Sequence, residues 1–202
     1  MRRIASALCL AAVVIVSTLP CAQADAPGGA AETKAQVLEQ SAANDAPPPP
    51  RETLSSTEVQ AVDPAGRESV DDAITCLART VYWEAKGGSE TNMEAVANVV
   101  MNRLGHEGFA DTVCGVVKQG VEQKNCQFSW WCDGRSDQVQ EEDRYTLAKA
   151  IAGKALNQQL ADHTGGALYF HDRKVAPGWG KTYIRTGATD KFVFYKPRRA
   201  TQ

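Results

Sequence analysis

The sequence has few histidines and no excess of basic residues. Its 202 residues include 3 His, 22 Lys and Arg, and 24 Asp and Glu, for a formal net charge of −2. Nucleic-acid binding requires a basic surface, so we expect no nucleic-acid partner. His106, His163 and His171 lack the close spacing of a zinc hydrolase, and we therefore expect no metal and no cofactor. Ser129 lies outside a G-x-S-x-G motif, which argues against a serine hydrolase.

The sequence has one long apolar run, from Ile4 to Leu19, directly after Arg2 and Arg3. Ala22-Gln23-Ala24 follows as a cleavage site, which completes the pattern of a signal peptide over residues 1–24. The run is shorter than the roughly 20 apolar residues that span a bilayer, which favours a cleaved signal over a membrane anchor. We therefore expect an exported protein, in the periplasm or at the cell exterior, with no membrane span after cleavage. We expect it to be a monomer.

Residues 25–67 contain no aromatic residue and are rich in Ala, Pro, Gln, Glu and Asp, with four prolines at 47–50. Such a stretch buries too little apolar surface to offset the entropy lost on ordering. We therefore expect a disordered linker over residues 25–67, followed by one folded domain over residues 68–202.

In the expected domain, the hydrophobic spacing changes along the chain from a helical period to short apolar runs. The expected helices cover residues 69–84, 91–104, 111–117 and 142–160. The expected strands cover residues 167–171, 182–185 and 192–195, of which the last two form a hairpin. Helices followed by strands predict an α+β domain with a small antiparallel sheet.

Removal of the signal peptide leaves four of the six cysteines, and an even number in an exported protein indicates disulfides. Four cysteines allow three pairings. We favour Cys126–Cys132, which closes a short loop, and Cys76–Cys114, which joins two helices and contributes roughly 4 kcal/mol in the chain-entropy model. The alternative is a zinc site made of all four cysteines, but paired C-x-x-C spacing is lacking.

Glu84 is the first candidate for catalysis. It follows Tyr82-Trp83 and precedes Gly87-Gly88, so bulky aromatics and open space surround it at the end of a helix. Burial in a cleft would raise the pKa of its carboxyl and keep it protonated as a general acid. On spacing alone, a capping or surface glutamate is the commoner case.

The segment from Cys126 to Gly134 is the second candidate, because it combines polar side chains with three aromatics. Aromatic faces suit the C–H faces of sugars, and Ser, Gln and Asp side chains can bind hydroxyls. We interpret Phe128 as a core residue and expect at least one of its two Trp neighbours to face the ligand. The candidate substrate-binding residues are Tyr82, Gln127, Ser129, Trp130, Trp131, Tyr169 and His171. A purely structural histidine is an equally good interpretation of His171.

Five segments resemble, in order, the motifs of the SleB/CwlJ-type cell wall hydrolases. They are ARTVYWEAKG at 78–87, VANVVMNR at 96–103, FADTVCGVV at 109–117, CQFSWWCDG at 126–134 and ALYFH at 167–171. The similarity runs from Cys76 to Tyr195. One residue departs from the family pattern: the second glutamate of the E-A-R-G-E motif is replaced by Gly88, and Glu90 stands two residues later.

The resemblance implies a fold like that of lysozyme and lytic transglycosylases, with peptidoglycan glycan strands as the partner. It implies cleavage between N-acetylmuramic acid and N-acetylglucosamine, with Glu84 protonating the glycosidic oxygen and the muramic acid's 6-hydroxyl attacking. Simple hydrolysis would require a second carboxylate, for which Asp133 is the candidate. Two alternatives stay open: an N-acetylmuramoyl-L-alanine amidase, and a non-catalytic peptidoglycan-binding module.

Overall fold

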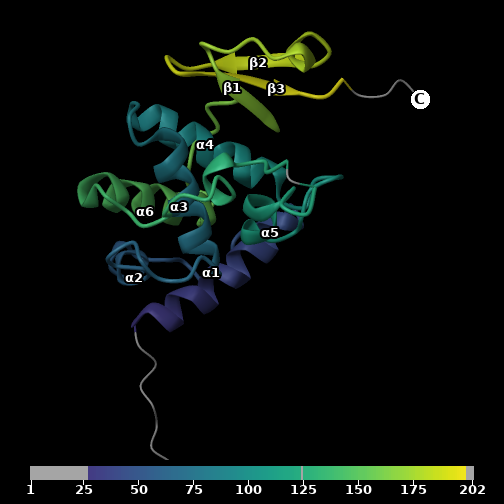
Figure 1. The fold of residues 1–202 in the computed structure, drawn as a ribbon. Coiled ribbons are helices and arrows are strands. Elements are labelled where there is room, and N and C mark those ends of the chain that lie inside the picture. The colour runs from purple at the N-terminus through teal and green to yellow at the C-terminus, as the bar shows by residue number, and fades with distance from the viewer. Residues whose placement is uncertain (1–26, 124, 199–202) are drawn as a thin grey trace, which may run out of the picture.

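The computed structural model describes residues 27–123 and 125–198, in which a layer of helices carries a three-stranded sheet at one end (Figure 1). The helices are α1 (Pro27–Ala43), α2 (Ser56–Ala61), α3 (Ala73–Ala85), α4 (Glu90–Arg103), α5 (Val113–Lys118) and α6 (Glu142–Leu156), with short 3-10 helices η1 (Ser129–Trp131) and η2 (Gly178–Lys181). The strands are β1 (Tyr169–Asp172), β2 (Ile184–Ala188) and β3 (Phe192–Lys196). The predicted α+β class is confirmed, whereas the predicted signal peptide lies outside the described residues.

Helix α3 is the centre of the helical layer and contacts α1, α4, α5 and α6. Asp72 begins it by accepting a hydrogen bond from the backbone N–H of Thr75 at 2.9 Å. Its inner face follows the helical period and is fully buried: Ile74, Leu77, Ala78 and Val81. Glu84 lies in its last turn. Among the helices that the structure describes, none is both long and apolar enough to cross a membrane.

The sheet has the order β1-β3-β2 and is antiparallel throughout, with β2 and β3 forming the predicted hairpin. Phe192 and Phe194 of β3 are buried in the core. Arg103, at the end of α4, donates a hydrogen bond from Nε to the carbonyl oxygen of Leu168 at 2.7 Å, just before β1. The segment that leads into β1 is therefore joined to the end of α4.

The expected disordered linker is wrong for residues 27–67, which fold as α1, a connection and α2. Ala31, Ala35 and Leu38 of α1 are buried at a spacing that places them on one helix face. Alanine has the highest helix propensity, and its small side chain lets two helices approach closely. A prediction that looks for large apolar side chains misses such a face. The four prolines lie in the connection between α1 and α2.

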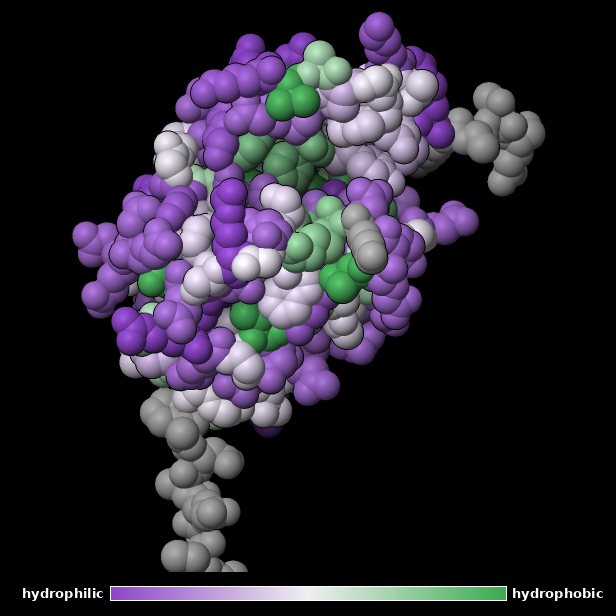
Figure 2. Space-filling view, in the orientation of Figure 1, coloured by the Kyte–Doolittle hydropathy of each residue, from purple (hydrophilic) through white to green (hydrophobic). Residues whose placement is uncertain are grey.

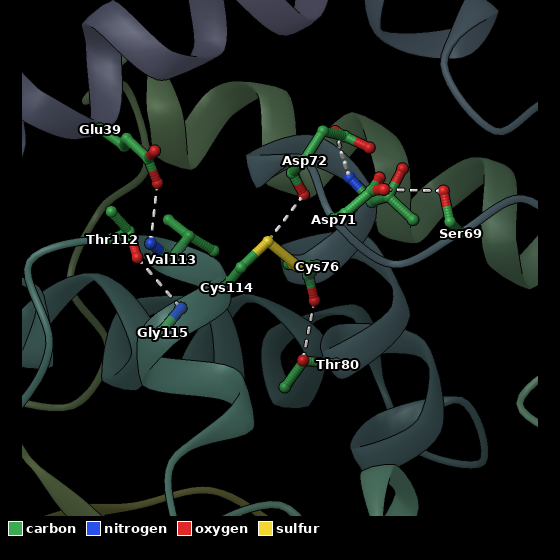
Figure 3. Close-up of a disulfide and its surroundings, with 11 residues drawn as sticks. Glu39, Ser69, Asp71, Asp72, Cys76, Thr80, Thr112, Val113, Cys114 and Gly115 are labelled. Atoms are coloured by element: carbon green, nitrogen blue, oxygen red, sulfur yellow. Dashed lines mark hydrogen bonds between the residues drawn. A yellow bond between two sulfur atoms is a disulfide. The ribbon is translucent and has the colours of Figure 1, made fainter.

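Polar contacts also join this N-terminal segment to the rest of the domain. Glu39 of α1 accepts a hydrogen bond at 2.7 Å from the backbone N–H of Val113, the first residue of α5 (Figure 3). The C-terminal end of α1 lies so close to Gly105 that a Cβ there would stand 2.1 Å from the Ala43 carbonyl oxygen. Residues 27–67 are therefore part of the folded domain, and residue 68 is not its boundary.

The structure contains both favoured disulfides. Cys76–Cys114 joins α3 to α5 (Figure 3), and Cys126–Cys132 closes the loop that carries η1. One helix end differs from expectation: α6 stops at Leu156 and not at residue 160. The next residue, Asn157, uses its side-chain amide to exchange two hydrogen bonds of 2.9 Å with the backbone of Leu54, so the chain turns there.

Candidate active site

Glu84 lies where two cavities meet. The Trp130 cavity has a volume of about 470 Å³ and is lined by Trp83, Trp130, Asp133, Asp137 and Gln140 among others. The Tyr169 cavity has a volume of about 440 Å³ and is lined by Arg103, Gln127, Tyr169, Trp179 and Tyr183 among others. Both are also lined by Glu84 and Ser129, so together they form one groove with Glu84 along its length. Each half is within the usual size of a ligand pocket, about 300–1,000 Å³.

The Tyr169 cavity lies at the boundary between the sheet and the helices, because its lining comes from α4, the 125–129 loop and β1. On the face drawn in Figure 2, a recess with hydrophobic residues at its floor separates the part that holds the sheet from the helical body. A groove between two parts of the fold can accept an extended polymer, since both of its ends can stay open.

The Glu84 carboxyl has a strongly raised pKa. Burial disfavours its charged form and raises the pKa to about 7, against the opposing effect of the positive charges on Lys191 and Arg103. Near neutral pH about half of the molecules then carry a protonated Glu84. This is the protonation behaviour required of a general acid that later accepts a proton.

Two cations lie close to Glu84. Lys191, in the turn between β2 and β3, donates a hydrogen bond from Nζ to the Glu84 carbonyl oxygen at 2.6 Å. Arg103 is 3% exposed, and its guanidinium lies 5.1 Å from the ring centres of both Phe109 and Phe128. Burial lowers the Arg103 pKa to about 10, so it stays charged at neutral pH. These charges would stabilise the Glu84 carboxylate after it gives up its proton.

The wall of the Trp130 cavity is held by the same helix that carries Glu84. Trp83 donates a hydrogen bond from Nε1 to the Asp137 carbonyl oxygen at 3.2 Å. The Tyr82 hydroxyl accepts hydrogen bonds from the backbone N–H groups of Gln140 and Glu141, both at 3.0 Å. Tyr82 is fully buried, so the prediction that it contacts substrate is wrong. Its position in α3 makes it a support for the wall.

Two aspartates line the Trp130 cavity together with Glu84. Asp133, the predicted second carboxylate, is exposed and accepts a hydrogen bond from the Arg135 backbone N–H at 2.9 Å. Asp137 was not predicted, and its pKa is raised, first by burial and then by the charge of Asp133. The Asp137 side chain is therefore a second candidate for any step that needs another carboxyl group.

The far end of the Tyr169 cavity is aromatic. Tyr169 and Tyr183 stack with ring centres 4.9 Å apart and an angle of 11° between their planes. Trp179 lies 5.5 Å from Tyr183 and is 36% exposed. Because a sugar ring presents C–H groups on its faces, this aromatic cluster suits a carbohydrate better than a charged ligand.

The structure brings most of the predicted site residues into the groove: Glu84, Gln127, Ser129, Trp130, Asp133 and Tyr169. Trp131 and His171 lie outside the lining of both cavities, so their predicted substrate contacts stay predictions. Trp131 packs against Trp130 and beneath Lys118, whose Nζ lies 4.7 Å from the ring centre. The His171 ring nitrogens lie 2.8 Å from the Asp172 carbonyl oxygen and 3.1 Å from the Tyr195 hydroxyl, so both are in contact with groups of the protein.

Sequence reasoning missed several residues of the groove, among them Arg103, Asp137 and Trp179. Arg103 ends the VANVVMNR segment, but a single arginine at a helix end gives no sign of burial. Asp137 stands in a polar loop with no pattern around it. Trp179 offered a signal that could have been used, since Pro177 and the two glycines beside the Trp indicate a loop, and loops lie at the surface.

Gly88, which stands at the second glutamate of the resembling motif, lies outside the lining of both cavities. The Gly88 carbonyl oxygen accepts a hydrogen bond from Arg144 Nη2 at 2.8 Å. A Cβ on Gly88 would stand 2.5 Å from the Asn92 side chain. Glu90 is exposed at the start of α4 and does not line either cavity. Over residues 27–123 and 125–198, no group of His, Cys, Asp and Glu side chains is placed to hold a metal ion.

Comparison with known proteins places the chain in a family. The model of the family described as Cell Wall Hydrolase matches residues 87–195, more than half of the chain, in a range that begins just after Glu84. The spore cortex-lytic enzyme of Halalkalibacterium halodurans is 35% identical over 117 residues, which cover 57% of this chain and 32% of that protein. The spore cortex-lytic enzyme of Oceanobacillus iheyensis is 31% identical over 125 residues, which cover 61% of this chain and 41% of that protein.

The match thus spans about a third to two fifths of the length of these two curated relatives. Among solved structures, the catalytic domain of the Bacillus cereus SleB protein is 30% identical with a TM-score of 0.50, covering 61% of this chain and 89% of that one. The chain therefore belongs to the Cell Wall Hydrolase family.

Proposed function

We propose that this protein cleaves the glycan strands of peptidoglycan between N-acetylmuramic acid and N-acetylglucosamine as a lytic transglycosylase, with Glu84 as general acid and base. The observation that carries the proposal is the position of Glu84 midway along an open groove, with a pKa raised to about 7. The family of the chain, and the similarity of the chain to spore cortex-lytic enzymes and to the SleB catalytic domain, support the same function.

The reaction that fits one central carboxyl group has two steps. Protonated Glu84 gives its proton to the glycosidic oxygen, and the bond from that oxygen to C1 of the muramic acid breaks through an oxocarbenium-like state. The 6-hydroxyl of the same sugar then bonds to C1 and passes its proton back to Glu84. No water is consumed, and the product ends in a 1,6-anhydro ring.

The surrounding residues supply what such a step needs. Between the two proton transfers Glu84 is an anion, and the charges of Lys191 and Arg103 stabilise it. In the Tyr169 cavity, Tyr169, Tyr183 and Trp179 offer aromatic faces to one part of the glycan. Ser129 borders both cavities, so its hydroxyl is available to a sugar on either side of the cleaved bond.

We also propose that the protein is exported, because its substrate lies outside the cytoplasm. The two disulfides support this proposal, since disulfides persist in oxidising compartments and are rare in the cytosol. The first of them fastens α3, which carries Glu84, to α5. The second encloses the loop that supplies Gln127, Ser129 and Trp130 to the groove.

Mass spectrometry of the soluble products from purified sacculi tests the proposal, with the chain from residue 25 onward as the enzyme. Anhydro-muropeptides are the expected products. Reducing muropeptides would mean hydrolysis with a second carboxyl group, to be sought with Asp133→Asn and Asp137→Asn variants. Free stem peptides would identify an amidase and overturn the proposal, as would the absence of any product.

We expect the activity to fall on the alkaline side of pH 7, because Glu84 must be protonated to start the reaction. Above its pKa of about 7, kcat/KM should drop about tenfold for each pH unit. The Lys191→Met variant removes a charge that lowers the Glu84 pKa, so its decline should begin at higher pH. Initial rates of sacculus solubilisation between pH 5 and pH 9 measure both curves. A flat profile in this range would contradict the assignment of Glu84.

A further inference from the structure

The wall of the Trp130 cavity, residues 133–140, is supported from behind by the N-terminal segment. The backbone N–H of Val139 donates a hydrogen bond to the Gly66 carbonyl oxygen at 3.0 Å. Gly66 has a φ of +65°, and a Cβ there would stand 2.3 Å from the Val139 side chain. Only glycine permits this close approach, so the two chain segments are fitted to each other.

Asp63, three residues before Gly66, is a buried carboxylate close to this contact along the chain. Its side chain is fully buried, and Oδ2 accepts hydrogen bonds from Arg79 Nε at 2.7 Å and from the Tyr145 hydroxyl at 2.6 Å. Arg79 Nη2 also lies 2.7 Å from Oδ2. Oδ1 accepts hydrogen bonds from the backbone N–H groups of Arg67 and Glu68. Each carboxylate oxygen of Asp63 therefore accepts two hydrogen bonds from groups inside the protein.

Arg79 continues this contact to the groove. Its side chain is 1% exposed, and its Nη1 donates a hydrogen bond to the Asp137 carbonyl oxygen. The Trp83 indole donates to the same carbonyl. A guanidinium is planar and holds its donors in a fixed arrangement, so the two contacts with Asp63 determine where Nη1 points. The orientation of Arg79 thus sets the position of the cavity wall.

We propose that Asp63 is a positioning residue for substrate binding: it orients Arg79, which holds the wall formed by residues 133–140 in place to bind a sugar in the Trp130 cavity. Asp63 lies outside the range matched by the family, residues 87–195. The N-terminal segment therefore takes part in substrate recognition, although it supplies no residue to the groove lining. The statement about the sugar rests on the proposed function, whereas the statement about the wall does not.

The Asp63→Asn variant tests both statements. Asparagine keeps the size of the side chain but removes the charge that pairs with Arg79. We expect the KM for solubilised glycan strands to rise at least tenfold and kcat to stay within about threefold, because Glu84, Lys191 and Arg103 are untouched. Hydrogen exchange at the amides of residues 139–141 should become at least tenfold faster.

The control is Glu58→Gln, which removes the charge of a half-buried ion pair with Lys34 in the same N-terminal segment, far from the cavity wall in sequence. It should leave the KM and the exchange at 139–141 unchanged. A folded Asp63→Asn protein with unaltered exchange there would overturn the proposal. A lower kcat and a lower melting temperature with an unchanged KM would also overturn it, because they indicate a structural role alone. The exchange result stands even if no glycan product is found.

A second variant covers the case in which Asp63→Asn does not fold. Asp63→Asn combined with Arg79→Met removes both buried charges, so no unpaired charge remains, and it leaves the Asp137 carbonyl without its Arg79 donor and with the Trp83 indole alone. We expect this protein to fold with a KM still raised at least tenfold and with fast exchange at residues 139–141. A wild-type KM together with wild-type exchange in the double variant would overturn the proposal.

Discussion

The Glu84→Gln variant is expected to bind sacculi normally and to release soluble muropeptides about 10²–10⁴ times more slowly than the wild type. Glutamine has the shape of glutamate but cannot donate a proton to a glycosidic oxygen. In the groove, Glu84 is the carboxyl that borders both cavities, and the other carboxyl groups in the lining, Asp133 and Asp137, border only one. Product release is followed by mass spectrometry, and binding by co-sedimentation with sacculi.

Glu90→Gln is the matched control for this variant. Glu90 is exposed, lies six residues further along the chain and does not line the groove, so its loss should leave the rate unchanged. It also tests whether Glu90 takes the place of the glutamate that Gly88 replaces. Equal rates for Glu84→Gln and the wild type would remove Glu84 from the mechanism. A slow Glu90→Gln enzyme would show that the groove extends to the start of α4.

The same Glu84→Gln protein should be more stable than the wild type at high pH. The unfolded state loses the Glu84 proton near pH 4.5, whereas the folded state keeps it up to about pH 7, because the pKa of Glu84 is raised in the folded protein. Stability from this group is therefore complete below pH 4.5 and lost as the pH rises through 7. At 1.36 kcal/mol per pKa unit, the gain at pH 8 is at most about 3 kcal/mol, with none at pH 4. Urea unfolding at both values measures it.

Removal of residues 27–67 is expected to prevent folding. The deletion exposes the faces that α1 and α2 cover and takes away Asp63, which leaves the buried guanidinium of Arg79 unpaired. Loss of one partner of a buried ion pair costs about 3–5 kcal/mol by itself. Typical domains have only about 5–15 kcal/mol of stability in total. Circular dichroism of a protein that begins at residue 68 should show no cooperative thermal transition.

The control for this deletion is a protein that begins at residue 27 and ends at residue 198. It retains α1, α2 and Asp63, so it should unfold cooperatively and keep its activity. A cooperative transition in the shorter protein, with a melting temperature within a few degrees of the longer one, would contradict the role given to residues 27–67. Near-ultraviolet spectra of both proteins would report whether Trp83 and its neighbours keep a fixed packing.

The core and the order of the elements were predictable because their signals are local. Ile74, Leu77 and Val81 follow the helical period, and Asp72 stands where a helix begins. The β2–β3 hairpin also follows from apolar segments on either side of a polar turn. The N-terminal helix was missed because its buried face consists mainly of alanine, which carries little weight in a hydrophobic pattern.

The residues of the groove divide in the same way. By itself, the sequence determined that Glu84 stands at the end of a helix and Tyr169 in a strand, and it favoured a disulfide around Gln127, Ser129 and Trp130, which the structure contains. Each of these statements depends on neighbours within a few positions along the chain. They were enough to predict a groove that combines a carboxyl group with polar and aromatic side chains.

Only the tertiary structure decided which side chains meet. It buried Tyr82, turned His171 towards Tyr195, and brought Arg103 and Lys191 to Glu84 from α4 and the sheet. It also joined Asp63 to the wall of the groove through Arg79. The direction of a side chain and the pairing of charges between distant segments depend on how the elements pack. The spacing of residues along the chain does not encode that packing. The pKa of Glu84 depends on its burial and on charges from distant segments, so only the folded protein gives Glu84 the pKa of a general acid.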